Sequence, residues 1–585
     1  MNQVAATATD QQPGWRKLLP GIGCALAVAL CVLLVHPVLE MGTNDDWSYI
    51  KTAQTFAATG HFVYNGWATA MLGWQIPWGA LFVRLFGFSF FAVRMSTVVL
   101  AMASGYLFYV ILLRFGLSTW NAVFGALVLM LSPLSLPLTT SFMTDIPGVF
   151  SILVCLYFCL RALTAKDVRA ALLWLCLAAG SNVVLGTVRQ IVWLGALVMV
   201  PSTFWLLRRY RRFMAIGLLL WLCSIVSLFA CLQWFQHQPY SLPEKLITGR
   251  LNGGAIAHFF SRMLRLVLTL LLCIFPVLAA WFSRVGKQKR ATLAKIAIVL
   301  ALFLPILFWA HKKHTLDHFL PPWLGNILSR TGISQVNAIM GNPPTVLPTW
   351  AMLALGFALI AATLIAIATI WEMNWDRVAR EPGVVSITGL GWRETLIILV
   401  PFTLANFVLL VPRGLDIGLW DRYILPIMIP VLILLLRVCQ QEFGRRLPLF
   451  SYATLALFTW FSVAGTHDEF AISRARLQAA NEVTDAGVPR TALSGGVEYD
   501  GWTQIEAQGY INDDRLVNPP GSYHPSPHAN ESCRKGDLDR TPAVVPVYVL
   551  TYTPVDCLLP SRFAPVNYRT WLAPSHRMIY VQQRP

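Results

Sequence analysis

Long apolar runs alternate with short polar segments along most of the chain. A transmembrane helix needs about 20 consecutive apolar residues. To within a few residues, the runs that we place in the bilayer are 18–39, 92–113, 119–138, 146–165, 170–187, 190–207, 213–235, 264–282, 293–310, 349–371, 394–411, 423–437 and 447–464. The pattern predicts a mainly α-helical, polytopic membrane protein with about 13 transmembrane helices.

Short clusters of Lys and Arg between the apolar runs indicate the topology. They all fall on one side of the membrane under this count, as the positive-inside rule requires for the cytoplasmic side. The clusters are 161–169, 208–212, 284–290 and 437–446. The N-terminus is expected on the same side, because Arg16 and Lys17 precede a first run that is too long for a signal-peptide core. An odd number of spans then places the C-terminal segment outside the cytoplasm.

The chain changes character near residue 465. Residues 1–464 hold the spans, and their first external loop (40–90) contains amphipathic segments that are expected to lie as helices in the membrane interface. From 465 to 585, helical spacing followed by short strand-like runs among Gly and Pro turns predicts a small α/β domain on the extracytoplasmic side. An oxidising compartment would allow Cys533 and Cys557 to form a disulfide there, with free thiols as the alternative.

Composition supports the membrane class and limits the partners. Of the 585 residues, 56% are hydrophobic and 12% are charged, and the formal net charge is +17. This charge would suggest nucleic acid in a soluble protein, but here the cations follow the pattern of topology signals. We therefore expect a multi-pass protein of the cell (inner) membrane, with membrane lipids and no nucleic acid among its partners.

An acidic pair, Asp45 and Asp46, follows directly after the first span. If the segment continues as a helix, Asp45 and Tyr49 share one face and Asp46 shares another with Ile50. One carboxylate can then face a cavity while the other turns away. The alternative is that the pair begins a solvated loop or caps a helix.

Several cations stand on the external side, against the positive-inside rule, and therefore need a reason. Guanidinium and ammonium groups bind phosphate oxygens, and a phosphate held at membrane depth belongs to a lipid. A lipid phosphate leaves as a stabilised anion without a general acid, whereas an attacking hydroxyl needs a base, for which Asp45 is the candidate. Each cation taken singly can instead be an interfacial anchor. These cations are Arg84, Arg94, Arg189, Lys312, Lys313 and Arg422.

Three histidines are spaced three and four residues apart beside two of these lysines. They are His311, His314 and His318, and on a helix they would share a face. That arrangement suits a divalent metal, and a cluster of cations snorkelling at a span end is the alternative. The sequence indicates no cofactor beyond this possible metal.

The first external loop resembles the type C glycosyltransferases, and within them the protein O-mannosyltransferase and lipid A aminoarabinose transferase group. The family pattern Asp-Glu-x-x-Tyr matches Asp45-Asp46-x-x-Tyr49, with Asp in place of Glu, and the segment from Trp74 to Arg94 is similar as well. The aminoarabinose subgroup has a Lys before the Pro that corresponds to Pro77, and Ile76 stands there in this chain.

Two later motifs carry the resemblance further. The family's second external Asp, after the third span, matches Asp145, and its late Arg-Tyr-x-x-Pro pattern matches Arg422, Tyr423 and Pro426. The resemblance implies a membrane glycosyltransferase that moves a sugar from a polyprenyl-phosphate donor to a hydroxyl of a lipid, glycan or protein acceptor. Asp45 and Asp145 are then the catalytic residues. The residues expected to bind substrate are Asp46, Tyr49, Arg94, Arg189, Lys312, Lys313, His314, Arg422 and Tyr423.

The competing class is a multi-pass transporter or flippase of a lipid-linked or anionic substrate, whose intramembrane charges would line a path. Against it, the charges gather at one face, and the spans lack paired Gly- or Pro-broken segments in corresponding halves. A scaffold without catalysis is a third possibility if the aspartates are only helix caps.

Overall fold

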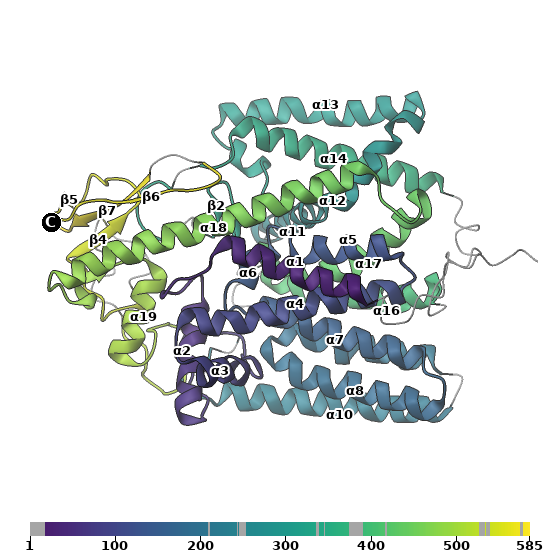
Figure 1. The fold of residues 1–585 in the computed structure, drawn as a ribbon, viewed down its shortest axis with the longest axis horizontal. Helices are drawn as coiled ribbons and strands as arrows, with labels where there is room; N and C mark the ends of the chain where they lie inside the picture. Colours follow the sequence, from purple (N-terminus) through teal and green to yellow (C-terminus); the bar gives the residue numbers. More distant parts are fainter. Residues whose placement is uncertain are drawn as a thin grey trace, which may run out of the picture.

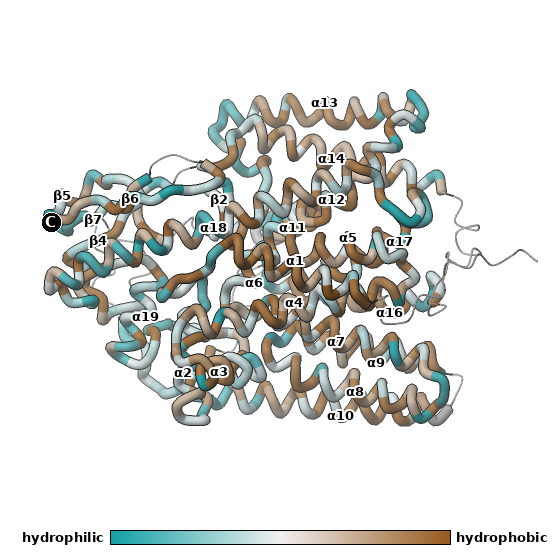
Figure 2. Tube along the Cα trace, viewed as in Figure 1, coloured by the Kyte–Doolittle hydropathy of each residue, from teal (hydrophilic) through white to brown (hydrophobic). Residues whose placement is uncertain are grey.

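Apolar helices run side by side through most of the molecule, and a smaller polar region lies beyond one end of them (Figure 1). The structure is a computed structural model that describes residues 18–208, 211–242, 244, 253–334, 338–343, 345–373, 390–415, 418–525, 533, 539–573 and 577–585. Apolar residues dominate the parallel helices, and polar residues gather at their ends and in the C-terminal region (Figure 2). This distribution is the one that a lipid environment requires of a helical bundle.

Ten helical segments of the described chain are long and apolar enough to cross a membrane. They contain α4 (Phe90–Arg114), α7 (Asp145–Leu163), α8 (Val168–Leu185), α10 (Arg211–Gln236), α11 (Gly253–Cys273), α13 (Arg290–Lys312), α14 (Thr349–Glu372), α16 (Trp392–Leu415), α17 (Leu425–Phe443) and α18 (Leu449–Asp485). The predicted fold class, a polytopic helical membrane protein, is confirmed.

The other three predicted spans form shorter apolar helices. The first is α1 (Leu19–Val35), and the second is α5 (Thr119–Met130), which ends shortly before Pro133. The third, near 190–207, begins as 3-10 and π turns and becomes regular only in α9 (Val200–Leu206). Sequence hydropathy recognises all three, but backbone breaks shorten the regular helix in each.

Two short helices of the first external loop lie across the direction of the long ones. α2 (Asp46–Thr59) and α3 (Gln75–Phe86) sit at the end of the bundle that faces the C-terminal region (Figure 1). On α3, Leu85 and Phe86 are exposed, as an interfacial helix requires. The amphipathic segments predicted in this loop thus correspond to the helices α2 and α3.

The longest helix, α18, joins the bundle to the C-terminal region without a break. It contains 37 residues and so extends about 55 Å, which exceeds the roughly 30 Å hydrocarbon core. The boundary predicted at residue 465 falls inside it. Gly465 lies there because a Cβ at this position would come within 2.8 Å of Ile333. The glycine thus allows the segment that carries Ile333 to pack directly on the helix.

The C-terminal region combines a small sheet with one helix. β4 (Tyr548–Thr551) pairs antiparallel with β7 (Arg577–Gln583), with Leu550 opposite Val581, and β3 (Leu493–Ser494) pairs parallel with β4. β5 (Leu559–Pro560) and β6 (Val566–Tyr568) also pair with β7. The helix is α19 (Val497–Gln508), which packs so closely on α2 that a Cβ at Gly501 would lie 2.6 Å from the ring of Trp47.

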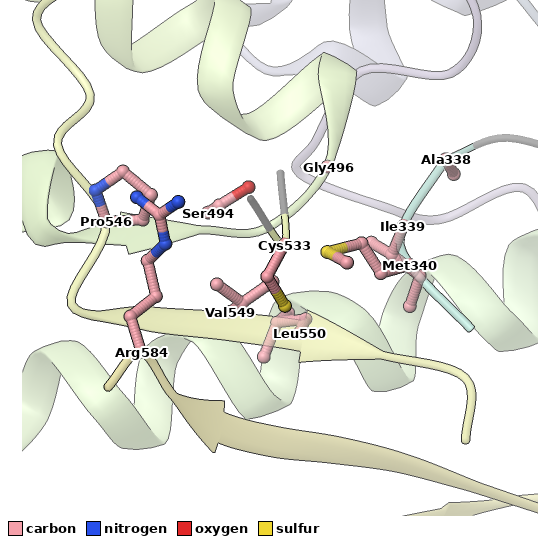
Figure 3. Close-up of a pocket in the computed structure, with 10 residues that line it drawn as sticks. All are labelled: Ala338, Ile339, Met340, Ser494, Gly496, Cys533, Pro546, Val549, Leu550 and Arg584. Carbon is pink, nitrogen blue, oxygen red and sulfur yellow. The ribbon is translucent and has the colours of Figure 1, made fainter. Parts of the chain in front are cut away.

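A disulfide joins Cys533 to Cys557 in this region, so the bridge allowed by the sequence is present. Cys533 lies beside a small cavity in which Ile339 and Met340, from the segment between α13 and α14, face Leu550 of β4 (Figure 3). Met340 also forms a bridge to Thr551 at the end of that strand. The segment between α13 and α14 therefore contributes to the edge of the C-terminal sheet.

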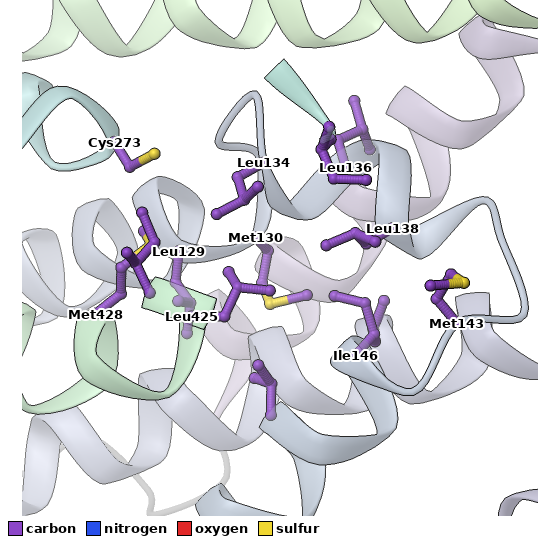
Figure 4. Close-up of a cluster of buried hydrophobic side chains, with 14 of the residues drawn as sticks. Leu129, Met130, Leu134, Leu136, Leu138, Met143, Ile146, Cys273, Leu425 and Met428 are labelled. Atoms are coloured by element: carbon purple, nitrogen blue, oxygen red, sulfur yellow. The ribbon is translucent and has the colours of Figure 1, made fainter. Parts of the chain in front are cut away.

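One part of the buried core lies next to the segments that carry Asp145 and Arg422. It includes Met130, Ile146 and Leu425 (Figure 4). α6 (Ser135–Thr139), the first turn of α7 and the first turn of α17 contribute to it. This packing fixes the positions at which α7 and α17 begin, and with them Asp145 and Arg422.

Candidate active site

Asp45 stands just before the first turn of α2, with its carboxylate partly open. Trp67 donates a hydrogen bond from Nε1 to Asp45 Oδ1 at 3.0 Å. The other oxygen, Oδ2, accepts from Nη2 of Arg422 at 3.3 Å. The side chain of Asp45 is 23% exposed. It is therefore held in one orientation while a ligand can still reach it.

Asp145 opens α7 and is almost closed off, with 1% of its side chain exposed. Its Oδ1 forms an ion pair with Nη1 of Arg189. Its Oδ2 lies 3.9 Å from Nη1 of Arg422 and accepts no hydrogen bond from the described part of the chain. A buried carboxylate oxygen in this state attracts a nearby cation or proton donor.

Arg422 connects the two carboxylates. It belongs to η7 (Asp421–Ile424), a short 3-10 turn that leads into α17, and 14% of its side chain is exposed. One of its terminal nitrogens faces Asp45 and the other faces Asp145. Its Nε is buried and makes no hydrogen bond within the described residues. The guanidinium thus has donor capacity left for another oxygen.

Two tyrosines border these charges. Tyr49 is buried on α2, and burial raises its pKa, with a further increase from Asp45 and an opposing effect of Arg422. Its phenol therefore stays protonated at any working pH and can donate a hydrogen bond. Tyr423 lies beside two guanidinium groups, with those of Arg189 and Arg413 5.0 and 4.9 Å from its ring centroid.

Asp46 turns away from this cluster and pairs with Arg94. Both side chains are fully buried, with Arg94 Nε 2.8 Å from Asp46 Oδ2. Asp46 also accepts from the backbone N–H of Thr43 at 2.8 Å and of Phe142 at 3.3 Å. Arg94 donates in turn to the carbonyl of Leu39 at 3.0 Å. Neither side chain presents a surface to a ligand, so this geometry suits positioning and not the predicted substrate contact.

The predicted separation of the two aspartates is therefore present in the structure. Asp45 is partly exposed, whereas Asp46 is buried in its ion pair. Hydrogen bonds to Asp46 come from the segment before α2 and from the segment before α7. This buried pair consequently fixes the two segments of the chain that carry Asp45 and Asp145.

Three of the predicted substrate-binding residues lie elsewhere. Lys312, Lys313 and His314 are exposed at the C-terminal end of α13, which runs along the outer edge of the bundle, away from α2 and α3 (Figure 1). Lys312 packs over the ring of Phe308. Charge alone suggested that these residues join the cluster, and the outer position of α13 keeps them apart.

The histidine spacing does not continue on one helix. His311 lies in α13, His314 has a positive φ of 54°, and His318 lies in the following 3-10 turn. No group of three or more His, Cys, Asp or Glu side chains suited to a metal ion occurs within the described ranges. The shared face that the spacing required is lost where α13 ends.

Sequence reasoning missed several residues that complete the site. Trp67 was not singled out as a site residue, yet its indole Nε1 donates a hydrogen bond to Asp45. Asp421, next to Arg422, is fully buried and accepts from the backbone N–H groups of Leu328 and Arg422, both at 2.7 Å. It ties the hairpin of β1 (Leu328–Ser329) and β2 (Gly332–Ile333) to η7. The available signal in the sequence was a carboxylate, Asp421, directly next to the candidate phosphate-binding residue Arg422.

The arrangement combines a partly exposed carboxylate with guanidinium groups at one end of the apolar bundle. A carboxylate can accept a proton, and the guanidinium groups can hold an anion with charge-assisted hydrogen bonds. These two capacities lie within one ion-pair distance of each other at Asp45 and Arg422.

Comparison with known proteins gave similarity only at the level of solved structures. No family model matches the chain, and no curated protein matches it. ArnT from Cupriavidus metallidurans bound to undecaprenyl phosphate is 12% identical, with 97% of this chain and 98% of that chain covered and a TM-score of 0.39. The archaeal oligosaccharyltransferase AglB from Archaeoglobus fulgidus, in complex with an inhibitory peptide and a dolichol-phosphate, is 13% identical, with 91% and 64% covered and a TM-score of 0.41.

A shorter match is to the protein O-mannosyltransferase Pmt1–Pmt2 complex of S. cerevisiae bound to its sugar donor. It is 14% identical, covers 38% of this chain and 33% of that chain, and has a TM-score of 0.32. The TM-scores of all three structures lie below 0.5, so the function of this chain is argued from its own residues.

Proposed function

We propose that this protein is an integral-membrane glycosyltransferase that moves a sugar from a polyprenyl-phosphate donor to an acceptor hydroxyl at the external face of the membrane. The observation that carries the proposal is the contact of one guanidinium, that of Arg422, with the carboxylates of both Asp45 and Asp145. Proton acceptance and phosphate binding are the two tasks that such a transfer sets. The acceptor is a lipid, a glycan or a protein.

Asp45 is the base in this proposal. The acceptor oxygen forms a bond to the anomeric carbon, and the proton of the acceptor hydroxyl goes to Asp45. The bond between the anomeric carbon and the phosphate oxygen breaks, and its electron pair remains on the phosphate. Arg422 and Arg189 bind this phosphate while its negative charge grows. Their shared partner, Asp145, supports catalysis by holding both guanidinium groups in place.

The remaining residues act around this centre. Tyr49 and Tyr423 border the bound donor, with Tyr49 as a hydrogen-bond donor because burial keeps its phenol protonated. Asp46 and Arg94 are positioning residues, since their buried pair fixes the segments before α2 and α7. Lys312 and Lys313 are interfacial anchors at the end of α13.

The proposal includes an orientation in the cell membrane. Residues 1–464 carry the site, and residues 465–585 form a domain on the extracytoplasmic side, with the N-terminus in the cytoplasm. The Cys533–Cys557 disulfide supports this orientation, because such bonds persist in oxidising compartments. Labelling of single cysteines placed in the N-terminal segment and near residue 520, with a membrane-impermeant maleimide on spheroplasts, tests it.

The main experiment compares two Asp→Asn variants in lipid nanodiscs. Asp45→Asn removes the basic oxygen, and transfer from a labelled polyprenyl-phosphate sugar to a mixture of envelope acceptors is expected to fall by about 10²–10⁴. The matched control is Asp167→Asn, because Asp167 only caps α8 through a bond to Ala170 N–H, and Asn caps equally well. Full transfer by a folded Asp45→Asn protein would refute the assignment of the base.

The transporter or flippase alternative makes a different prediction in the same preparation. A transporter would move the labelled lipid across a vesicle membrane without forming a new glycosidic bond. A transferase would move the label from the lipid fraction to an acceptor, on one side of the membrane only. Movement without transfer would favour the transporter class.

A further inference from the structure

A further ion pair lies beside the proposed phosphate site and involves Arg413 and Glu244. Arg413 stands in the last turn of α16, and its Nη2 pairs with Oε1 of Glu244, from the segment between α10 and α11. Its Nη1 donates to the hydroxyl of Tyr423 at 2.6 Å. Tyr423 directly follows Arg422 in η7. Arg413 therefore adds another guanidinium to the group formed by Arg189 and Arg422.

Each guanidinium in this group has a carboxylate partner from the protein. Arg189 pairs with Asp145, Arg422 with Asp45, and Arg413 with Glu244. An incoming anion has to displace one of these partners or share it, because the group is already neutralised. The partner that can move is the one least fixed by other contacts.

Glu244 is that partner. Asp145 is buried, and Asp45 is held by Trp67 at 3.0 Å. Glu244 is 26% exposed and lies outside any helix or strand, and among the described residues it pairs with Arg413 and lies near the charge of Arg515. Its longer side chain also allows a larger displacement than an aspartate would.

We infer that Arg413 and the Tyr423 hydroxyl extend the site of the single donor phosphate by a subsite that Glu244 occupies, and that this phosphate displaces Glu244. The inference rests on the proposed function. A phosphodiester carries a single negative charge, whereas the phosphate monoester released by sugar transfer carries about −1.5 to −2 at pH 7. The carboxylate of Glu244 competes for Arg413 adequately with the phosphodiester and poorly with the monoester. Arg413 therefore contributes most to phosphate binding as the donor bond breaks.

The chemistry of the subsite fits this role. Arg413 offers two terminal nitrogens to phosphate oxygens once Glu244 has left, and the Tyr423 hydroxyl accepts from Arg413 while its own proton remains available. Glu244 lowers the apparent affinity for the anion because it occupies the binding groups itself. Removing its charge should therefore strengthen phosphate binding.

The test measures binding of ³²P-labelled decaprenyl phosphate to the full-length protein in nanodiscs. Glu244→Gln keeps the size and removes the charge, and the dissociation constant is expected to fall by about three- to tenfold. Arg413→Gln is expected to raise it by about tenfold, and the double variant should show no gain from Glu244→Gln. The matched control is Glu506→Gln, which breaks the exposed Arg490–Glu506 pair of α19 and should leave binding unchanged.

Inorganic phosphate added at millimolar concentration forms the second arm. If it competes with the lipid in Glu244→Gln, the subsite recognises phosphate itself; if only the lipid binds, the subsite recognises a phosphate presented from the bilayer. Either result requires the tightening in Glu244→Gln. Unchanged or weaker lipid binding in that variant would overturn the inference. Should Arg413→Gln fail to fold, Arg413→Lys gives the comparison, because it keeps the charge and loses the fork.

This outcome is separable from that of the proposed function. The binding measurement needs no sugar transfer, so tightening in Glu244→Gln would support the subsite even if Asp45→Asn transferred sugar normally. Conversely, loss of transfer in Asp45→Asn with unchanged lipid binding in Glu244→Gln would support the base and reject the subsite. A further readout is product inhibition by decaprenyl phosphate, which should become stronger in Glu244→Gln.

Discussion

Nη2 of Arg422 lies 3.3 Å from Oδ2 of Asp45, although the two residues are 377 positions apart in the sequence. The same guanidinium also reaches Asp145 at 3.9 Å. The N-terminal ends of α2, α7 and α17 therefore meet at one point. This meeting is the geometric basis of the proposed transfer site, and it defines which substitutions are informative.

The first prediction concerns the geometry of Arg422. Arg422→Lys keeps the positive charge but cannot contact two oxygens through a planar fork. We expect the donor KM to rise and kcat to fall, together reducing kcat/KM by about 10- to 100-fold, as loss of one charge-assisted hydrogen bond implies. Steady-state transfer with varied donor measures this. Unchanged donor kinetics would mean that Arg422 is only an anchor and that the phosphate binds elsewhere.

Trp67 should affect the rate through Asp45. Trp67→Phe removes the indole N–H that binds Asp45 Oδ1 and keeps an aromatic ring near Trp47, whose centroid is 5.0 Å away. Losing this hydrogen bond should cost about 1 kcal/mol, which is about fivefold in kcat, with donor KM unchanged. Trp67→His retains a ring N–H and should recover part of the rate. Equal loss in both variants would indicate a packing role alone.

Asp421 is predicted to position Arg422 through the backbone. Asp421→Asn keeps the size but removes the charge that accepts from Leu328 and Arg422. The expected cost is about 1–3 kcal/mol of unfolding free energy, together with a higher donor KM. Thermal unfolding and donor kinetics measure the two effects. Loss of stability with an unchanged KM would show that the hairpin does not set the position of Arg422.

The buried Asp46–Arg94 pair should matter for folding more than for chemistry. Asp46→Asn leaves the fully buried Arg94 without its counter-charge, and breaking such a pair typically costs about 3–5 kcal/mol. The yield of folded protein and the thermal midpoint should therefore fall, in contrast to Asp45→Asn. Asp46→Asn combined with Arg94→Met should recover part of the stability, because neither charge is then left unpaired. A fully stable Asp46→Asn protein would contradict this assignment.

The disulfide gives a prediction for the C-terminal region. Replacing both Cys533 and Cys557, which are 24 positions apart, with Ser should destabilise this region by about 3 kcal/mol. Proteolysis of the purified protein, with and without reductant, would detect the change as faster cleavage beyond residue 485. The control is Cys176→Ser, since Cys176 is an exposed free thiol. Equal resistance of the double variant would show that the sheet and α19 hold the region without the bond.

Much of the architecture follows from the sequence because helical spans are encoded locally. Hydropathy and charge placed the apolar runs, the two helices of the first external loop and the C-terminal strands near β3 and β4. Asp45 and Arg422 were selected from the sequence as charges at membrane level, which are few and stand out against apolar neighbours. Asp145 was selected through the family resemblance. The continuity of α18 through residue 465 was not found. A helix needs no change of hydropathy to remain a helix, so composition marked a boundary that the backbone does not have.

The order of amino acids specifies which residues carry charge at the ends of the spans, whereas the packing of the helices selects which of those residues meet. Helical periodicity separated Asp45 from Asp46, but only the fold buried Asp46 against Arg94 and brought Arg422 to Asp45. Lys312, Lys313 and His314 have suitable chemistry but lie at the end of the outer helix α13, whereas Trp67, which was not singled out from the sequence as a site residue, binds the central carboxylate. The reason is physical: hydropathy reports the environment of each segment along the chain, whereas ion pairs form across helices whose neighbours are selected by packing.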